Sequence, residues 1–143
     1  METFVVSDLA RNRRVVVDAA RREPVRIRDA DGTMLVLTTE AQAIDHALLL
    51  SYFEIYLRTS IECTHDAPNR VLLGPVSYIS DWTKEQRQMF LDDFLEALSE
   101  ASRTHTATPV TTFIDYFAPK PGRVSPLVDP DVLSRLGDAL AAR

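Results

Sequence analysis

Hydrophobic and polar positions alternate with period two near the start of the chain. Residues 25–28 have the sequence Val-Arg-Ile-Arg, which is typical of a strand with one buried face. Asp31 and Gly32 follow, and because both residue types tolerate positive φ, they predict a tight two-residue hairpin turn. Residues 34–37 then return as an apolar strand, and residues 3–6 indicate a further short strand. The pattern therefore predicts a small sheet that contains a hairpin.

Helical spacing predicts one helix before this hairpin and one after it. Ser7 is the expected N-cap of a helix that runs to about Arg22, because a serine oxygen can accept hydrogen bonds from the free amides of the first turn. Thr39 and Gln42 have the spacing of a capping box and predict a long helix over about residues 43–61. Apolar residues lie on most sides of this second helix, so it needs covering from more than one direction. The apolar side of the first helix is expected to consist of Leu9, Val16, Val17 and Ala20.

The second half of the chain is predicted to be helical. Residues 64–81 contain Pro, Asn and Gly and are expected to be a connection, with a short extended piece at 71–73. The expected helix starts after it are a capping box at Thr83 and Gln86, the pair Thr108-Pro109 and the pair Asp129-Pro130.

These elements predict an α+β protein with two modules. Residues 1–63 hold a short strand, a basic helix, a β-hairpin and a long helix, and residues 64–143 form a small helical C-terminal module. The length of 143 residues and a hydrophobic content of 45% are those of a globular protein that buries a core.

Charge is distributed unevenly along the chain. The net charge of the whole chain is -5, but residues 1–28 carry seven arginines against four acidic residues. Any contact with nucleic acid is therefore expected to be local and close to the N-terminus. A single cysteine, Cys63, and an N-terminus without an apolar leader predict a cytoplasmic protein. The most apolar stretch, 47–53, is far shorter than the roughly 20 residues that cross a bilayer.

One polar cluster, residues 62–66, contains Cys63 and His65 beside acidic residues. Adjacent residues rarely converge on one ligand, and zinc sites need ligands at wider spacings, so a helix end with a buried thiol is the favoured interpretation. His46 and His105 are isolated in the sequence. No phosphate-binding loop or hydrolase motif occurs in the sequence. The sequence therefore predicts no enzyme, no catalytic residue, no metal and no cofactor.

The basic group Arg11, Asn12, Arg13 and Arg14 is a stronger candidate for function. Guanidinium groups bind phosphates and guanine edges, and an asparagine amide can pair with adenine or with a phosphate. Taken by itself, such a group is better explained as a solvated helix face, because charge runs usually are.

The order of elements over about residues 3–57 resembles the N-terminal domain of the Phd/YefM, or prevent-host-death, antitoxins. The resemblance lies in the whole succession, since each piece is common by itself. The segments that carry it are Val6-Ser7-Asp8-Leu9, Arg11-Asn12, Glu23-Pro24-Val25, Asp31-Gly32 and Leu35-Val36-Leu37-Thr38.

This resemblance implies a homodimer in which paired hairpins and helices form one core and present arginines to a palindromic operator. The DNA-binding residues that it implies here are Ser7, Arg11, Asn12, Arg13 and Arg14. A dimer, or a higher oligomer, is also expected because a unit of about 40 residues is near the lower limit for folding alone. Its short sheet would in addition leave an edge to be paired.

In antitoxins of this kind the C-terminal segment binds and neutralises a partner toxin. The sequence therefore predicts an antitoxin that represses its own operon and binds a cognate toxin. The alternative is an orphan transcription regulator, or a protein-interaction module with an antitoxin-like fold and no toxin. Aromatic residues of the second module are either anchors for a partner or the core of a self-contained helical module, and core is favoured for most. They are Trp82, Phe90, Phe94, Phe113 and Phe117, with Tyr116 beside them.

Overall fold

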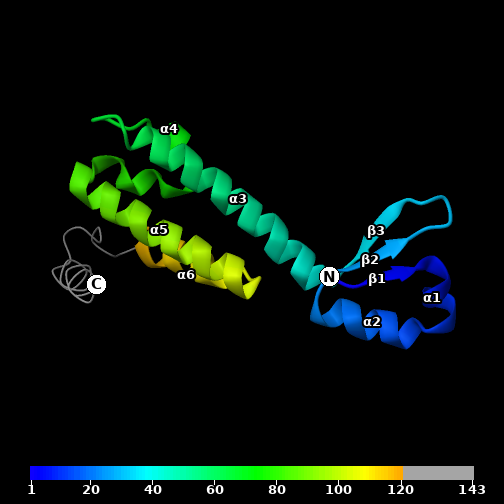
Figure 1. The fold of residues 1–143 in the computed structure, drawn as a ribbon. Helices are drawn as coiled ribbons and strands as arrows, with labels where there is room; N and C mark the ends of the chain where they lie inside the picture. Colours follow the sequence, from blue (N-terminus) through cyan, green and yellow to red (C-terminus); the bar gives the residue numbers. More distant parts are fainter. Residues whose placement is uncertain (121–143) are drawn as a thin grey trace. The chain divides into compact units, whose positions relative to one another are not determined.

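A three-stranded mixed sheet is the centre of the N-terminal part of the protein (Figure 1). The structure is a computed structural model, and it describes residues 1–120. The strands are β1 (Thr3–Val5), β2 (Val25–Arg28) and β3 (Met34–Leu37), in the order β1-β2-β3. β1 runs parallel to β2, and β3 runs antiparallel to it with Leu35 opposite Ile27. The α+β class, with a small sheet near the N-terminus followed by helices, is confirmed.

Two short helices, rather than one, lie between β1 and β2. They are α1 (Val6–Arg11) and α2 (Arg13–Arg22), and the backbone leaves helical geometry at Asn12, with φ -128° and ψ 36°. The prediction of one helix from Ser7 to Arg22 is therefore wrong.

Ser7 is also not the N-cap of α1. The chain leaves β1 in an extended conformation at Val5, which makes Val5 the N-cap and places Ser7 inside the first turn. Asp8 caps the helix instead, because its carboxylate accepts a hydrogen bond from the backbone amide of Val5 at 3.0 Å.

The core of this first unit lies between α2 and the sheet. Val16 from α2 and Val25 from β2 are fully buried, and Ile27 is nearly so. Arg26 and Arg28 alternate with them and are exposed, which confirms the period-two interpretation of this strand. The remaining core residues are Ala19 and Ala20, and Phe4, Leu9 and Leu37 pack at their margin.

The predicted hairpin is present, but its loop is longer by one residue than the two-residue turn that was expected. The backbone amide of Asp29 donates to the carbonyl of Thr33 at 2.8 Å, and the amide of Gly32 donates to the carbonyl of Asp29 at 3.1 Å. These bonds enclose three loop residues, the last of which, Gly32, has φ +88°. This is the arrangement of a turn followed by a left-handed residue, which glycine adopts without steric cost.

A long helix, α3 (Glu40–Glu62), follows the sheet. The capping box at its start is confirmed, since the amide of Thr39 donates to the Gln42 side chain at 3.0 Å and the amide of Gln42 donates to the Thr39 hydroxyl at 3.2 Å. α3 thus begins a few residues earlier than the sequence indicated. The described chain divides into two compact units within this helix, after Leu48. The sequence suggested a boundary at residues 63–64, whereas the C-terminal half of α3 belongs with the later helices.

Up to residue 120, the second unit contains four further helical segments. The prediction of an extended piece at 71–73 is wrong, because the chain forms the short helix α4 (Arg70–Leu73) there. The Asn69 side chain caps this helix by accepting a hydrogen bond from the amide of Val71 at 3.0 Å. A 3-10 helix, η1 (Gly74–Asp81), follows directly. The two remaining helices are α5 (Lys84–Thr104) and α6 (Thr108–Phe117).

The predicted starts of α5 and α6 are confirmed, with a shift of one residue at α6. At α5 the Thr83 amide donates to the Gln86 side chain at 2.9 Å, and the Gln86 amide donates to the Thr83 hydroxyl at 3.2 Å. At α6 the N-cap is Ala107, so Thr108 is the first helical residue rather than the cap. The helix expected from Asp129-Pro130 lies outside the described residues.

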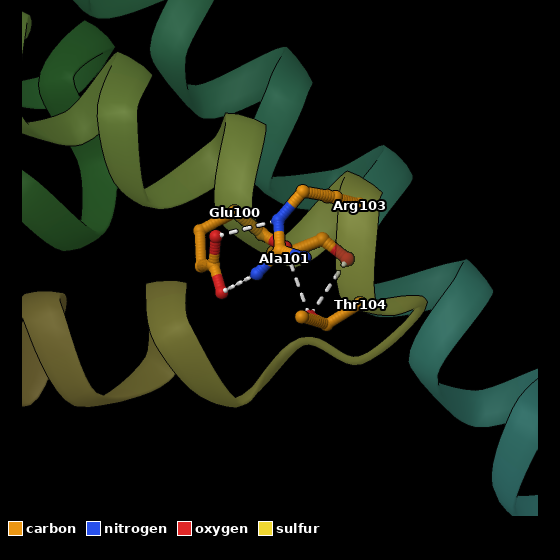
Figure 2. A network of polar contacts seen from close by, with 4 residues as sticks. All are labelled: Glu100, Ala101, Arg103 and Thr104. Atoms are coloured by element: carbon orange, nitrogen blue, oxygen red, sulfur yellow. Dashed lines mark hydrogen bonds and ion pairs between the residues drawn. The ribbon is translucent and has the colours of Figure 1, made fainter.

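The last turn of α5 is held by a compact polar network (Figure 2). Two nitrogens of the Arg103 guanidinium contact the two carboxylate oxygens of Glu100, at 3.0 and 2.6 Å. This contact lowers the pKa of Glu100, because the hydrogen bonds favour its charged form. The hydroxyl of Thr104 donates to the carbonyl of Glu100 at 2.9 Å. His105 then ends the helix in a left-handed conformation with φ 55°.

A ring cluster forms the core of the second unit. Phe90 lies at its centre, with its ring centroid 5.8 Å from that of Trp82, 5.9 Å from that of Phe94 and 5.5 Å from that of Phe117. Such tilted and edge-to-face contacts add to the free energy gained by burial. The residues of α3 that pack against this core are Leu49, Tyr52, Ile55 and Tyr56. Within residues 1–120, no helix has the length and apolar character needed to span a membrane.

Candidate nucleic-acid interface

The junction of α1 and α2 brings the candidate basic residues together. Arg11 is the last residue of α1, Asn12 is the break, and Arg13 and Arg14 open α2. All four are exposed. The amide of Asn12 donates to the carbonyl of Asp8 at 2.7 Å, and its carbonyl accepts from the amide of Val16 at 3.2 Å. The backbone of Asn12 is thus held on both sides, while its side chain makes no capping bond and projects from the junction.

The arginines of the junction differ in their electrostatic partners. The Arg14 guanidinium lies 3.7 Å from the Asp18 carboxylate, although the Arg14 side chain is 95% exposed. Asp18 also contacts Arg21 at 3.3 Å. Within the part of the chain that the structure describes, Arg11 and Arg13 form no ion pair. Their charge is therefore available to an anion.

Ser7 lies on the same side of α1 as Arg11, because residues four apart are neighbours on a helix surface. Ser7 also borders a shallow depression of about 640 Å³ between the start of α1 and the hairpin loop. Arg28 lines the depression from β2, and Asp29 and Asp31 line it from the loop. The depression is thus of mixed charge, with one arginine and two aspartates in its lining.

Sequence reasoning did not include Arg28 among the candidate residues. Its signal was present in the period-two pattern of β2, which places Arg26 and Arg28 on the exposed face of the sheet. The pattern could not show that the start of α1 lies beside this strand, because that proximity follows from the parallel pairing of β1 with β2.

The aromatic residues considered as partner anchors lie inside the second unit. Trp82, Phe90, Phe94 and Phe117 are all less than 10% exposed, and Phe113 is half-buried against them. The four buried rings contact one another edge to face, so the described structure presents none of them to a partner. It is the core alternative that fits their positions, because they fall on the helix faces that turn toward each other.

The polar cluster at residues 62–66 is a structural turn. The Glu62 carboxylate accepts a hydrogen bond from the Asn69 amide at 3.0 Å, which ties the end of α3 to the start of α4. Cys63 is buried, and burial raises the pKa of its thiol, so the unreactive protonated form is favoured. No cluster of three or more potential metal ligands occurs among the described residues.

Arg87 holds this turn, a role that the sequence did not indicate. Its guanidinium is buried and donates to the carbonyls of His65 and Asp66, each at 3.3 Å. Arginine provides several donors in one planar group, and α5 brings Arg87 to Asp66 from 21 residues away in the sequence.

Comparisons of this chain with protein-family models, with curated proteins and with solved structures give no match. The resemblance of residues 3–57 to the Phd/YefM antitoxins therefore rests on the order of elements and on the residues that carry it.

Proposed function

We propose that this protein is the antitoxin of a type II toxin–antitoxin system, and that it binds its operator DNA as a dimer and represses its own operon. The observation that carries the proposal is the exposed, largely unpaired group Arg11–Arg14 at the junction of α1 and α2. A net positive N-terminal part in a chain of net charge -5 supports a local contact with DNA rather than general adhesion to polyanions.

The proposed contacts follow from the chemistry of each side chain. Arg11 and Arg13 form charge-assisted hydrogen bonds with phosphates or with guanine edges, and Asn12 pairs with a base or a phosphate. Arg14 exchanges its contact with Asp18 for a phosphate, at little cost because an exposed ion pair contributes less than about 1 kcal/mol. The Ser7 hydroxyl donates a hydrogen bond to the DNA backbone beside the contact that Arg11 makes.

The first unit also has the surface that dimerisation requires. Leu35 lies on the same sheet face as the buried Ile27, directly across from it, and is nevertheless 48% exposed. Within the described residues β3 pairs with β2 alone, so its outer edge offers free backbone groups as well. A second copy would cover both features.

The DNA contact is tested by the double variant Arg11→Ala/Arg14→Ala. If each arginine neutralises one phosphate, the slope of log affinity against log salt concentration falls in magnitude by about 2, and affinity drops at every salt concentration. The measurement is fluorescence anisotropy with an operator fragment, which is first recovered by incubating the protein with fragmented genomic DNA and sequencing what is retained.

A matched control is Arg70→Ala/Arg103→Ala, which removes two exposed arginines from the second unit. This control is expected to leave the salt slope unchanged. An unchanged slope in Arg11→Ala/Arg14→Ala would contradict the assignment of these two residues. A fall in the salt slope of the control variant would place the DNA contact in the second unit.

Dimerisation through the first unit is tested by Leu35→Glu. The substitution places a charge in the proposed interface, and we expect it to lower the molecular mass measured by sedimentation and to weaken operator binding. Val36→Glu puts the same charge on the same strand, but on the opposite face. If both variants dissociated equally, or if neither dissociated, the result would argue against an interface on the Leu35 face.

The partner of the second unit is proposed to be a basic toxin protein. Residues 49–120 contain six basic and ten acidic residues, which favours association with a positively charged surface. An adjacent reading frame that encodes a small basic protein, and co-purification with that protein, would support this part of the proposal.

A second candidate function is a transcription regulator, or interaction module, that has no toxin. The specific observation that favours it is the ring core of the second unit, in which Phe90 and Phe94 are almost completely buried without any partner. A unit with its own core does not need a toxin in order to fold. Operator binding by a protein whose gene has no toxin beside it would favour this candidate.

A further inference from the structure

α3 carries an apolar stripe that is exposed among the residues that the structure describes. The α3 stripe consists of Leu50, Phe53, Leu57 and Ile61, with exposed fractions of 60%, 37%, 59% and 62%. The spacings of three and four residues place these side chains along one side of the helix. Exposed apolar stripes of this kind are typical of interfaces, because scattered surface residues do not align in this way.

The stripe is distinct from the face that α3 uses for its own fold. That face holds Leu49, Tyr52 and Tyr56, which pack against the core of the second unit, and the fully buried Thr59. At 100° per residue, the stripe is rotated well away from this face. α3 therefore has two apolar sides, of which the described structure covers one.

The stripe, with spacings of three, four and four residues, is approximately symmetric about its middle. Leu50 and Ile61 lie at equal distances along the sequence from a point between Ile55 and Tyr56. Phe53 and Leu57 lie at equal distances from Ile55. The charged residues beside the stripe follow the same symmetry. Glu54 and Arg58 have opposite charges and are centred on Tyr56, and within one chain they form an ion pair.

We propose that the α3 stripe binds the α3 stripe of a second copy of this chain, antiparallel across a two-fold axis near Ile55 and Tyr56. In this arrangement each Leu50 meets the partner's Ile61, and each Phe53 meets the partner's Leu57. Each Glu54 then lies opposite the partner's Arg58, so the two symmetry-related charge contacts beside the two-fold axis are complementary. An unrelated partner protein would not require this symmetry. The proposal is independent of DNA binding and of the dimer contact at Leu35.

The size of the stripe sets the expected strength of the contact. From Leu50 to Ile61 the helix rises by about 16 Å, which is short for a standard protein interface. We therefore expect a reversible association that depends on protein concentration in the micromolar range. Its role is to join copies that are already concentrated, for example on adjacent DNA sites.

The charge pair provides a test that separates contacts between chains from contacts within one chain. Glu54→Arg makes both positions positive, and Arg58→Glu makes both negative, so each variant alone repels its own copy. We expect each to lower the association constant about tenfold. Mixing the two variants restores opposite charges across the interface, although the ion pair within each chain is still broken. Recovery of association in the mixture, measured by sedimentation velocity, is the expected result.

The apolar part of the contact is tested in the full chain that carries Leu35→Glu, which removes the other dimer contact proposed above. In this background we expect association to persist, and Leu57→Glu to abolish it. The matched control is Leu95→Glu, a substitution of a similarly exposed leucine on α5. It is expected to leave the association unchanged.

Three results would overturn the proposal. They are a chain with Leu35→Glu that stays monomeric at every concentration, an association that is insensitive to Leu57→Glu, and a mixture of the charge variants that associates no better than either alone. The first two would indicate that a different partner, or another part of the chain, covers the stripe. None of these results bears on the salt slope of DNA binding, so the two proposals fail separately.

Discussion

At the scale of single residues, Arg87 is the side chain that organises the connection between α3 and α5. It is only 3% exposed, and besides the carbonyls of His65 and Asp66 it donates to the carbonyl of Trp82 at 3.0 Å. A buried charge is costly unless it is hydrogen-bonded, and here the two terminal nitrogens of one guanidinium donate to several backbone carbonyls, whereas its Nε is buried without a partner among the described residues. One side chain thus adds to the backbone hydrogen bonds of the turn, in which the amide of His65 donates to the carbonyl of Glu62 at 3.0 Å.

Replacing Arg87 is expected to destabilise the second unit. Arg87→Met keeps much of the apolar stem but leaves the carbonyls without donors, so we expect a loss of about 3 kcal/mol in the free energy of unfolding. Arg87→Lys retains the charge but not the planar fork, and it should lose less. Denaturant unfolding followed by Trp82 fluorescence measures both. Arg103→Met, at an exposed position, is the control, and an equal loss there would refute a special role for Arg87.

At the scale of elements, the loop between β2 and β3 shows how one glycine sets the geometry of the hairpin. Gly32 closes the loop at φ +88°, and the Asp31 carboxylate accepts from the amide of Thr33 at 2.8 Å. This bond lowers the pKa of Asp31, because it favours the charged carboxylate. The loop determines the register in which Leu35 lies opposite Ile27.

Gly32→Ala is expected to destabilise the first unit by about 1 kcal/mol, because an L side chain is strained at this backbone angle. A Cβ atom at Gly32 would meet no atom within 4 Å, so steric contact contributes nothing to the loss. Gly32→Asn should lose less, since asparagine tolerates left-handed conformations. Thermal unfolding followed by far-UV circular dichroism measures the difference. A stabilising effect of Gly32→Ala would show that the loop has another conformation in solution.

At the scale of the whole molecule, residues 1–120 form two hydrophobic cores that share no residue. One contains Val16 and Ile27, and the other contains Phe94, Leu98 and the ring of Trp82. The basic candidate interface belongs to the first unit, and the α3 stripe belongs to the second. Functions proposed for the two units can therefore be altered one at a time.

Two core substitutions test this separation. Ile27→Ala and Leu98→Ala each create a cavity, and we expect each to cost about 3 kcal/mol in its own unit. Because Trp82 lies in the second core, its fluorescence transition should shift with Leu98→Ala and remain in place with Ile27→Ala. Far-UV circular dichroism should detect both. If Ile27→Ala shifted the Trp82 transition equally, the two cores would unfold as one cooperative unit.

Local signals in the sequence predicted most of the elements. The capping boxes at Thr39 and Thr83 and the alternation in residues 25–28 depend on neighbours a few residues away, and the structure confirms each of them. Exposure of Arg11–Arg14 could likewise be anticipated, because no apolar spacing directs these residues toward a core.

What the tertiary structure alone decided are the features that depend on distant residues. The break at Asn12 follows from connecting β1 to a helix that must pack on the sheet, and the burial of Arg87 follows from the meeting of α5 with the turn after α3. The division of α3 between two units, and the apolar stripe that this leaves exposed, have the same origin. A sequence records which residues are apolar, whereas contacts between elements determine which of them are covered.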